Sequence, residues 1–122
     1  MPFKFEKLEV WQKALALSGW IHELTKKFPR DELFVLTSQM KRAADSVVLN
    51  IAEGSTGQTN AEFRQFLSYA LRSAVEVVAC LHLALNRNLI DRRQFDLYSA
   101  KAETIIKMTQ ALRKALSRTV DR

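Results

Sequence analysis

Four basic side chains near the C-terminus have a spacing that suits phosphate binding. Arg93, Lys107 and Lys114 are separated by multiples of seven residues, and Arg118 follows one helical turn later. In an α-helix this spacing places all four in one row, roughly opposite the apolar stripe of the same segment. Each contact between such a cation and a phosphate releases a counterion, which favours binding to nucleic acid. The row therefore predicts a nucleic-acid interface, although a solvated outer face has the same pattern.

The overall charge favours the same class of partner. The 122 residues include 19 Lys plus Arg and 13 Asp plus Glu, which gives a formal net charge of +6. The surplus is concentrated from residue 87 onward, where nine basic residues stand against four acidic ones. A polyanion such as RNA or DNA suits this surplus. The alternative is that the charge only keeps the protein soluble.

Polar residues recur at intervals of three and four along two other segments, which we name the polar ladders. The first comprises Gln39, Arg42, Ser46, Asn50 and Glu53, and the second comprises Glu62, Gln65, Tyr69, Arg72, Ser73 and Glu76. Opposite charges on the ladders can pair between helices or between subunits, where such pairs fix register more than they add stability. The default alternative is an exposed ladder whose ion pairs each contribute only about tenths of a kcal/mol. An oligomer interface there would use Gln39, Ser46, Asn50, Glu53, Glu62, Tyr69 and Glu76. Arg42 and Arg72 are also candidates for phosphate contacts.

The first helical segment has more apolar surface than one core face needs. Leu8, Trp11 and Leu15 form a second stripe about 100° from the first, and Trp20 adds further apolar bulk. One interpretation is that these residues widen the core face. The other is that a neighbouring subunit covers them, which makes the second stripe a further candidate for an oligomer interface.

The residue types that catalysis or metal binding needs do not converge in the sequence. Neither histidine has a partner at a metal-ligand spacing, and Cys80 lies among apolar residues, which favours an inert buried thiol. Glu53, Glu62 and Glu76 lack the ExxH pairs of di-iron bundles. No glycine-rich phosphate loop is present. We expect no enzymatic activity, catalytic residue, metal, cofactor or small-molecule substrate.

Four helices are predicted to position these residues. Apolar residues recur with a helical period over about residues 7–28, 31–54, 59–85 and 91–116. The predicted boundaries are Pro29, an N-cap at Asp31, a left-handed turn at Gly54, and capping boxes at Thr59–Glu62 and Asp91–Gln94.

Short connections between four helices favour antiparallel neighbours. The sequence therefore predicts an all-α protein, an antiparallel up-and-down four-helix bundle formed by one domain over residues 1–122, with a long helical hairpin array as the alternative. The single cysteine and the charged N-terminus indicate a cytoplasmic protein without a signal peptide. We expect no membrane span, because no apolar run approaches about 20 residues.

One block of the sequence resembles a known family. The block is Gln39, Arg42, Ala43, Ala44, Ser46, Asn50, Ile51, Ala52, Glu53 and Gly54, followed by Glu62, Phe63, Phe66 and Leu67. Leu8, Trp11, Ala14, Phe28, Pro29 and Leu36 fit the same pattern. The pattern is similar to that of the four-helix-bundle proteins encoded in intervening sequences of bacterial 23S ribosomal RNA genes.

The resemblance implies a homo-oligomer, typically a pentameric ring of four-helix bundles, without enzymatic activity. It also implies a relationship to the accessory proteins of diversity-generating retroelements, which work with a reverse transcriptase and nucleic acid. We therefore consider two hypotheses for the function. The first is an oligomer that binds RNA or DNA through phosphate contacts, and the alternative is a protein-interaction or assembly module with no nucleic-acid partner.

Overall fold

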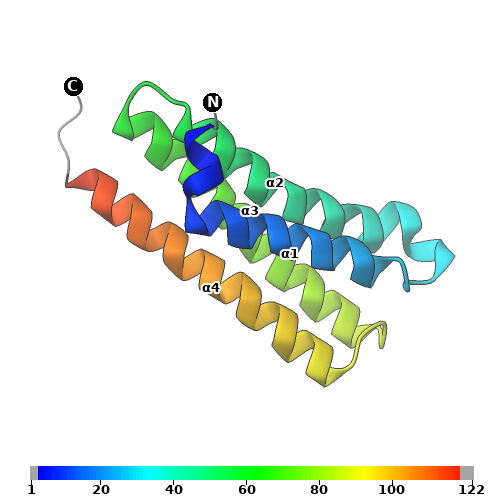
Figure 1. The fold of residues 1–122 in the computed structure, drawn as a ribbon. Coiled ribbons are helices and arrows are strands. Elements are labelled where there is room, and N and C mark those ends of the chain that lie inside the picture. The colour runs from blue at the N-terminus through cyan, green and yellow to red at the C-terminus, as the bar shows by residue number, and fades with distance from the viewer. Residues whose placement is uncertain (1–2, 119–122) are drawn as a thin grey trace.

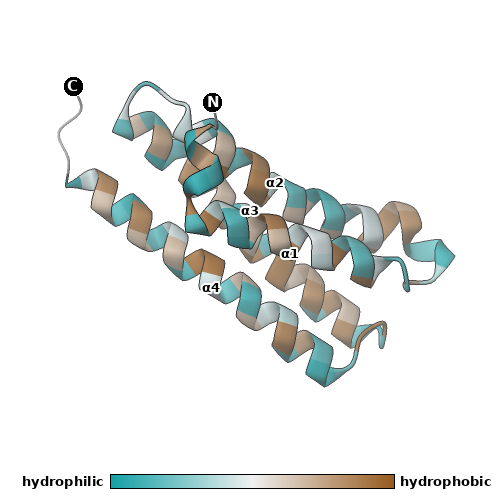
Figure 2. Cartoon of the chain, in the orientation of Figure 1, coloured by the Kyte–Doolittle hydropathy of each residue, from teal (hydrophilic) through white to brown (hydrophobic). Residues whose placement is uncertain are grey.

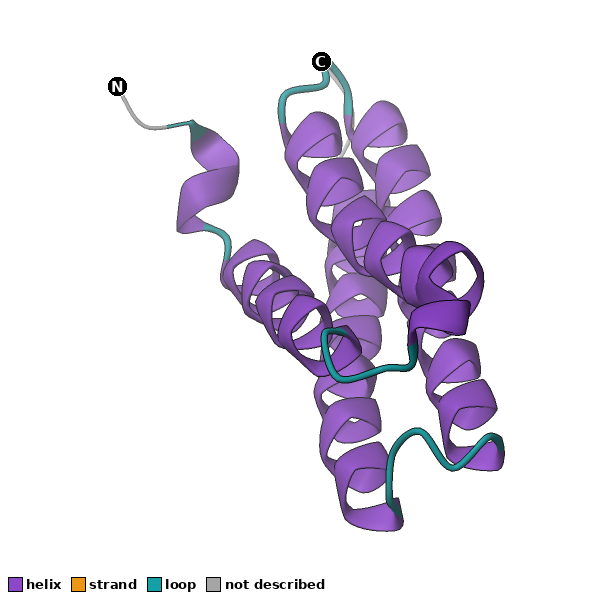
Figure 3. Cartoon of the chain, turned by 90° about the vertical axis from the view of Figure 1, so that its right-hand side faces the viewer, coloured by secondary structure: helices purple, strands orange, loops and turns teal. Residues whose placement is uncertain are grey.

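The computed structural model describes residues 3–118, and its four long helices form one bundle. They are α1 (Glu9–Thr25), α2 (Ser38–Ser55), α3 (Asn60–Asn86) and α4 (Arg92–Ser117). Each helix packs against the next in sequence, and α1 also packs against α4 (Figure 1). No strand occurs within residues 3–118 (Figure 3). The predicted antiparallel up-and-down four-helix bundle is confirmed. Asp121 and Arg122, which contribute to the charge count above, lie outside the described residues.

The core is built from one apolar stripe on each helix, as the helical period predicts. Hydrophobic and hydrophilic residues alternate along every helix (Figure 2). The largest fully buried apolar side chains are Leu17, Ile21, Leu36, Met40, Val47, Ile51, Leu67, Val77, Leu81 and Ile105. Leu33 belongs to the second predicted helical segment, residues 31–54, whose helical period places it on the apolar stripe, but it is 45% exposed.

The connection between α1 and α2 explains why Leu33 lies outside the core. Residues Arg30–Glu32 form a 3₁₀ turn (η2), and Leu33–Thr37 form a π-helical turn (η3) that leads into α2. Asp31 lies inside η2, so the predicted N-cap at Asp31 is wrong. A π turn inserts an extra residue into the helical repeat. Leu33, Phe34 and Val35 at the start of η3 therefore leave the buried stripe, and Phe34 is 87% exposed, whereas Leu36 stays in the core.

Gly54 has a different role from the predicted one. Helix α2 continues through Gly54 to Ser55, and no described glycine has a positive φ, so the predicted left-handed turn is wrong. The left-handed residue is instead Asn88, with a φ of 59° just after α3. There the Leu89 N–H donates to the Ala84 carbonyl at 2.9 Å, which is the bond of a Schellman motif.

The predicted capping box is complete at the start of α4, whereas at α3 only the bond to the Thr59 side chain is formed. Thr59 Oγ1 accepts a hydrogen bond from the Glu62 N–H at 3.1 Å. Asp91 Oδ1 accepts from the Gln94 N–H at 2.7 Å, and Gln94 Oε1 accepts from the Asp91 N–H at 2.9 Å. A side chain therefore satisfies one backbone donor in the first turn of α3 and of α4, and in α4 Gln94 also satisfies the N–H of the N-cap residue.

Helix α3 is apolar on more than its core face. By length and composition it could cross a membrane, contrary to the expectation that no such run exists. Between Gln65 and Asn86 the only charged residues of α3 are Arg72 and Glu76. In the structure α3 packs between α2 and α4, and core helices of soluble proteins meet the same criterion. The length of α3 is therefore weak evidence for a membrane span.

Candidate nucleic-acid interface

The four residues of the predicted basic row lie on the outer side of α4. Arg93, Lys107, Lys114 and Arg118 are all exposed, whereas Ile105 on the opposite side is 1% exposed. At 1.5 Å per residue the row extends about 37 Å along the helix. The row is therefore accessible along its full length in this chain.

The free positive charge is concentrated in the C-terminal half of α4. Lys107 Nζ lies 3.2 Å from Glu103, whereas within residues 3–118 no carboxylate pairs with Arg93, Lys114 or Arg118. Between residues 104 and 118 the helix has no acidic residue. Cations near a helix C-terminus also interact favourably with the helix dipole. The spacing in the sequence does not distinguish the four residues of the row, whereas the structure separates the paired Lys107 from the other three.

Arg42 and Arg72 do not join the basic row. Both are exposed, but they lie on α2 and α3. Arg42 lines a groove of about 610 Å³ between α2 and η3 on one side and α3 on the other. The structure therefore places the two arginines on a separate face from the row on α4.

The two polar ladders meet within one chain. Gln39 Nε2 donates to Glu76 Oε2 at 3.2 Å, and Ser73 Oγ donates to Ser46 Oγ at 2.8 Å. Asn50 Nδ2 donates to the Ser46 carbonyl at 2.9 Å. The first two contacts join α2 to α3 and the third lies within α2, so the ladders touch within the chain, while pairing of their opposite charges between subunits stays a prediction. Further ladder residues remain exposed, namely Glu53, Glu62 and Tyr69.

The second apolar stripe of α1 is largely covered by the chain itself. Leu8 and Trp11 are partly buried and pack against the core. The rings of Trp11 and Phe5 meet edge to face, with their centroids 4.8 Å apart. Leu15 remains 49% exposed. Leu8 and Trp11 thus contact the core and Leu15 is the exposed residue of the stripe, while its coverage by a neighbouring subunit stays a prediction.

A polar cluster that the sequence did not reveal links α1 to α2. Ser18 Oγ donates to Asp45 Oδ1 at 2.6 Å, and His22 Nε2 lies 2.9 Å from the same oxygen. In a catalytic triad the serine must donate to the histidine. Here the serine donates to the aspartate, so the cluster connects two helices and does not activate a nucleophile.

Cys80 is buried as predicted, and its surroundings keep it protonated. The thiol is 1% exposed, and burial, with a smaller effect from the charge of Glu76, raises its pKa to about 11.

In the described part of the chain no three His, Cys, Asp or Glu side chains gather as a metal site would require. Glu53, Glu62 and Glu76 therefore do not converge.

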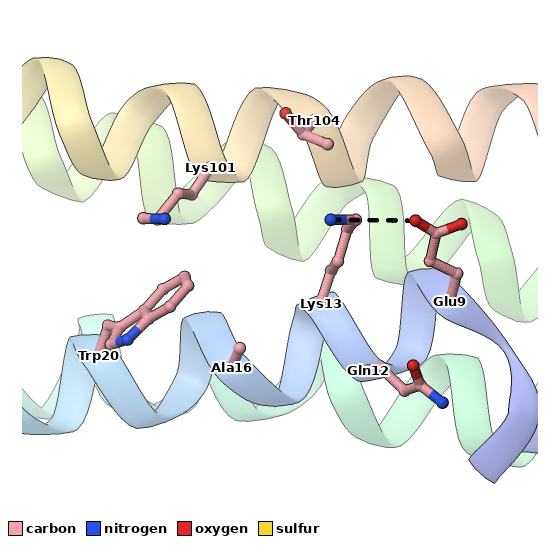
Figure 4. Close-up of a pocket in the computed structure, with 7 residues that line it drawn as sticks. All are labelled: Glu9, Gln12, Lys13, Ala16, Trp20, Lys101 and Thr104. Carbon is pink, nitrogen blue, oxygen red and sulfur yellow. Dashed lines mark ion pairs between the residues drawn. The ribbon is translucent and has the colours of Figure 1, made fainter.

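A groove between α1 and α4 was also missed by the sequence reasoning. It measures about 450 Å³ and is lined by Glu9, Gln12, Lys13, Ala16, Trp20, Lys101 and Thr104 (Figure 4). Lys101 Nζ lies 4.0 Å from the centre of the Trp20 ring, and Lys13 Nζ lies 4.0 Å from Glu9. The seven-residue spacing between Lys13 and Trp20 places both on one face of α1, and this pattern could have been found in the sequence.

Comparison with known proteins identifies the family. The model of the family described as "23S rRNA-intervening sequence protein" matches residues 6–111. The chain belongs to this family. Six chains of solved structures also match, whereas no curated protein does. One structural relative is described as a protein with unknown function from the S23 ribosomal protein family of Bacteroides thetaiotaomicron. It is 28% identical, has a TM-score of 0.81, and covers 86% of this chain and 98% of its own.

The match to the 23S rRNA-intervening sequence family covers the candidate sites unequally. Both polar ladders and the groove between α1 and α4 lie inside residues 6–111, as do Arg93 and Lys107. Lys114 and Arg118 lie beyond the matched residues. The unpaired cations at the end of α4 are thus a feature of this chain that the family match does not include.

Proposed function

We propose that this protein is a non-enzymatic homo-oligomer that binds RNA or DNA through phosphate contacts along the basic row of α4. The observation that carries the proposal is the exposed, acid-free half of α4, where Lys114 and Arg118 have no carboxylate partner within the described residues. The net charge of +6 adds a long-range attraction for polyanions.

The geometry favours backbone contacts over base readout. Lys107 and Lys114 are about 10.5 Å apart along the helix axis. Separate point charges of this kind position a protein on phosphates but do not read base edges. Binding through three or four phosphates predicts a log–log salt slope of about −3 to −4 on duplex DNA.

Fluorescence anisotropy with a structured RNA, a DNA duplex and a single strand, from low to physiological salt, tests this proposal. We expect binding to all three that weakens steeply with salt. Reversing the charges of Lys107, Lys114 and Arg118 together should remove most of it. Absence of binding at low salt, or binding unaffected by the reversal, would contradict the proposal.

The outer face formed by α2, η3 and α3 supports the oligomer. It carries exposed apolar side chains that the chain itself does not cover, namely Phe34, Val35, Leu49, Tyr69, Val75 and Leu83. By composition α3 is apolar enough to resemble a buried helix, yet Val75 and Leu83 on its outer side are exposed. A second copy of the chain would cover its outer side, in line with the pentameric ring that the family resemblance implies.

Light scattering coupled to size exclusion tests the oligomer with two substitutions of matched exposure. Val75 on α3 is 52% exposed and Leu97 on α4 is 51% exposed. We expect Val75→Glu to lower the particle mass and Leu97→Glu to leave it unchanged. A monomeric wild-type protein, or equal effects of the two substitutions, would rule out this face as the interface.

The second candidate function is a protein-interaction or assembly module without a nucleic-acid partner. The observation that favours it is Phe34, which is 87% exposed beside the groove that Arg42 lines. An aromatic side chain next to an arginine is typical of protein-binding surfaces. If nucleic acid does not bind at low salt, this function becomes the better explanation of the exposed face.

A further inference from the structure

The groove between α1 and α4 combines an aromatic ring with two cations. Trp20 is 40% exposed and lies at one end, with Lys101 above its ring (Figure 4). Lys13 extends from α1 toward α4 nearer the other end, where Glu9 lies. The volume of about 450 Å³ falls in the range of about 300–1,000 Å³ that small ligands occupy.

We propose that this groove holds one unpaired nucleotide of a bound strand, with its base on Trp20 and its flanking phosphates at Lys13 and Lys101. This inference rests on the proposed function, since it requires that the protein binds nucleic acid. It adds a site for single strands to the phosphate contacts of the row. Stacking on an indole accepts every base, so the site needs no sequence preference.

One edge of the groove lies beside the basic row on α4. At about 100° per residue, Thr104 lies about 60° round α4 from Lys101 on one side and about 60° from Lys107 on the other, and about 20° from Arg93, which is about 16 Å away along the axis. Thr104 lines the groove and Arg93 belongs to the row. A strand whose phosphates follow the row therefore passes the open side of the groove, where a base without a pairing partner can turn inward.

A bound nucleotide can replace the contacts that Lys101 and Lys13 make in the groove. The Lys101 ammonium lies over Trp20 on a surface open to water, and such exposed cation–π contacts are weaker than a base stacked on an aromatic side chain. Lys101 can then contact the phosphate next to the stacked base. Glu9, at 4.0 Å from Lys13, competes with a phosphate for that lysine.

Anisotropy with three labelled 12-mers distinguishes stacking from phosphate contact. The probes are oligothymidine, an abasic strand with the same phosphates, and a DNA duplex. We expect Trp20→Leu to weaken oligothymidine binding about 5- to 150-fold and to leave the other two probes within about twofold. Trp20→Phe, which keeps a ring, should retain most of the affinity, and Glu9→Gln should strengthen oligothymidine binding.

The outcomes separate this inference from the proposed function. If Trp20→Leu changes no probe, or all three equally, the groove holds no base, although binding to the row stands. If no probe binds the wild-type protein at low salt, both proposals fail. Circular dichroism of Trp20→Leu and Trp20→Phe establishes that both variants keep the helical fold.

Discussion

Gly54 on α2 lies so close to Phe66 on α3 that a Cβ added to the glycine would stand 2.6 Å from the Cβ of Phe66. Real Cβ atoms do not approach that closely, and a Cβ cannot swing aside as the end of a long side chain can. The two helices would therefore have to move apart. Glycine is required here by close packing and not by a turn.

Gly54→Ala should consequently destabilise the bundle, by about 1–3 kcal/mol as expected for overpacking. Gly19 in α1 is the matched control, because a Cβ there meets nothing within 4 Å. Gly19→Ala should raise the free energy of unfolding by about 0.5–1 kcal/mol through helix propensity. Urea denaturation measures both changes. Two substitutions with effects of the same sign would contradict the packing argument.

The link between Ser18 and Asp45 gives a second prediction. Asp45→Ala removes the acceptor of the hydroxyl of Ser18, a residue that is 9% exposed, which should cost about 1–3 kcal/mol. Asp96→Ala removes an exposed ion pair with Arg92 and should cost at most about 1 kcal/mol. Thermal or urea unfolding of the two variants makes the comparison. Equal losses would show that the link between α1 and α2 is no stronger than a surface pair.

The pKa of about 11 for Cys80 predicts slow labelling of the native protein. At pH 8 about one thiol in a thousand is ionised at that pKa, against about one in ten at the ordinary value of 9.0. A maleimide or disulfide reagent should therefore react at least about 100-fold more slowly with native protein than with protein unfolded in urea. Equal rates would show that Cys80 is accessible and ionisable in the fold.

The same raised pKa makes stability depend on alkaline pH. Well below pH 9 both the folded and the unfolded thiol hold their proton, so Cys80 contributes no slope there. Between about pH 9 and 11 the unfolded thiol loses its proton first, and the free energy of unfolding falls as pH rises. Cys80→Ala should lack this component, and the difference between the two proteins isolates it from other groups that titrate there.

The unpaired cations of α4 predict a change in salt dependence. Replacing Lys114 and Arg118 together by Gln should weaken binding to a DNA duplex and lower the log–log salt slope by about two. The control replaces Lys26 and Lys27 by Gln, which changes the net charge equally at exposed positions after α1. Anisotropy titrations from about 50 to 200 mM salt provide the slopes. A control that behaves like the α4 variant would show that net charge alone governs binding.

The sequence by itself determined the helices, their buried stripes and two of their caps. Each depends on residues close together in the chain. Thr59 and Asp91 cap helices through bonds that span three residues. The helical period likewise set the basic row on one side of α4, because the angle between two residues on one helix follows from their separation. The family block around Gly54 was also readable without the fold.

Only the tertiary structure decided how the helices approach one another. The contact that excludes a side chain at Gly54 involves Phe66, twelve residues away, so the sequence offered a local turn in its place. The π turn at Leu33–Thr37 and the bond between Ser18 and Asp45 likewise depend on packing between separate segments. Trp20 and Lys101 are 81 residues apart and meet only because α1 and α4 close the bundle. Such contacts depend on the spacing and rotation of whole helices, which no local pattern of residues specifies.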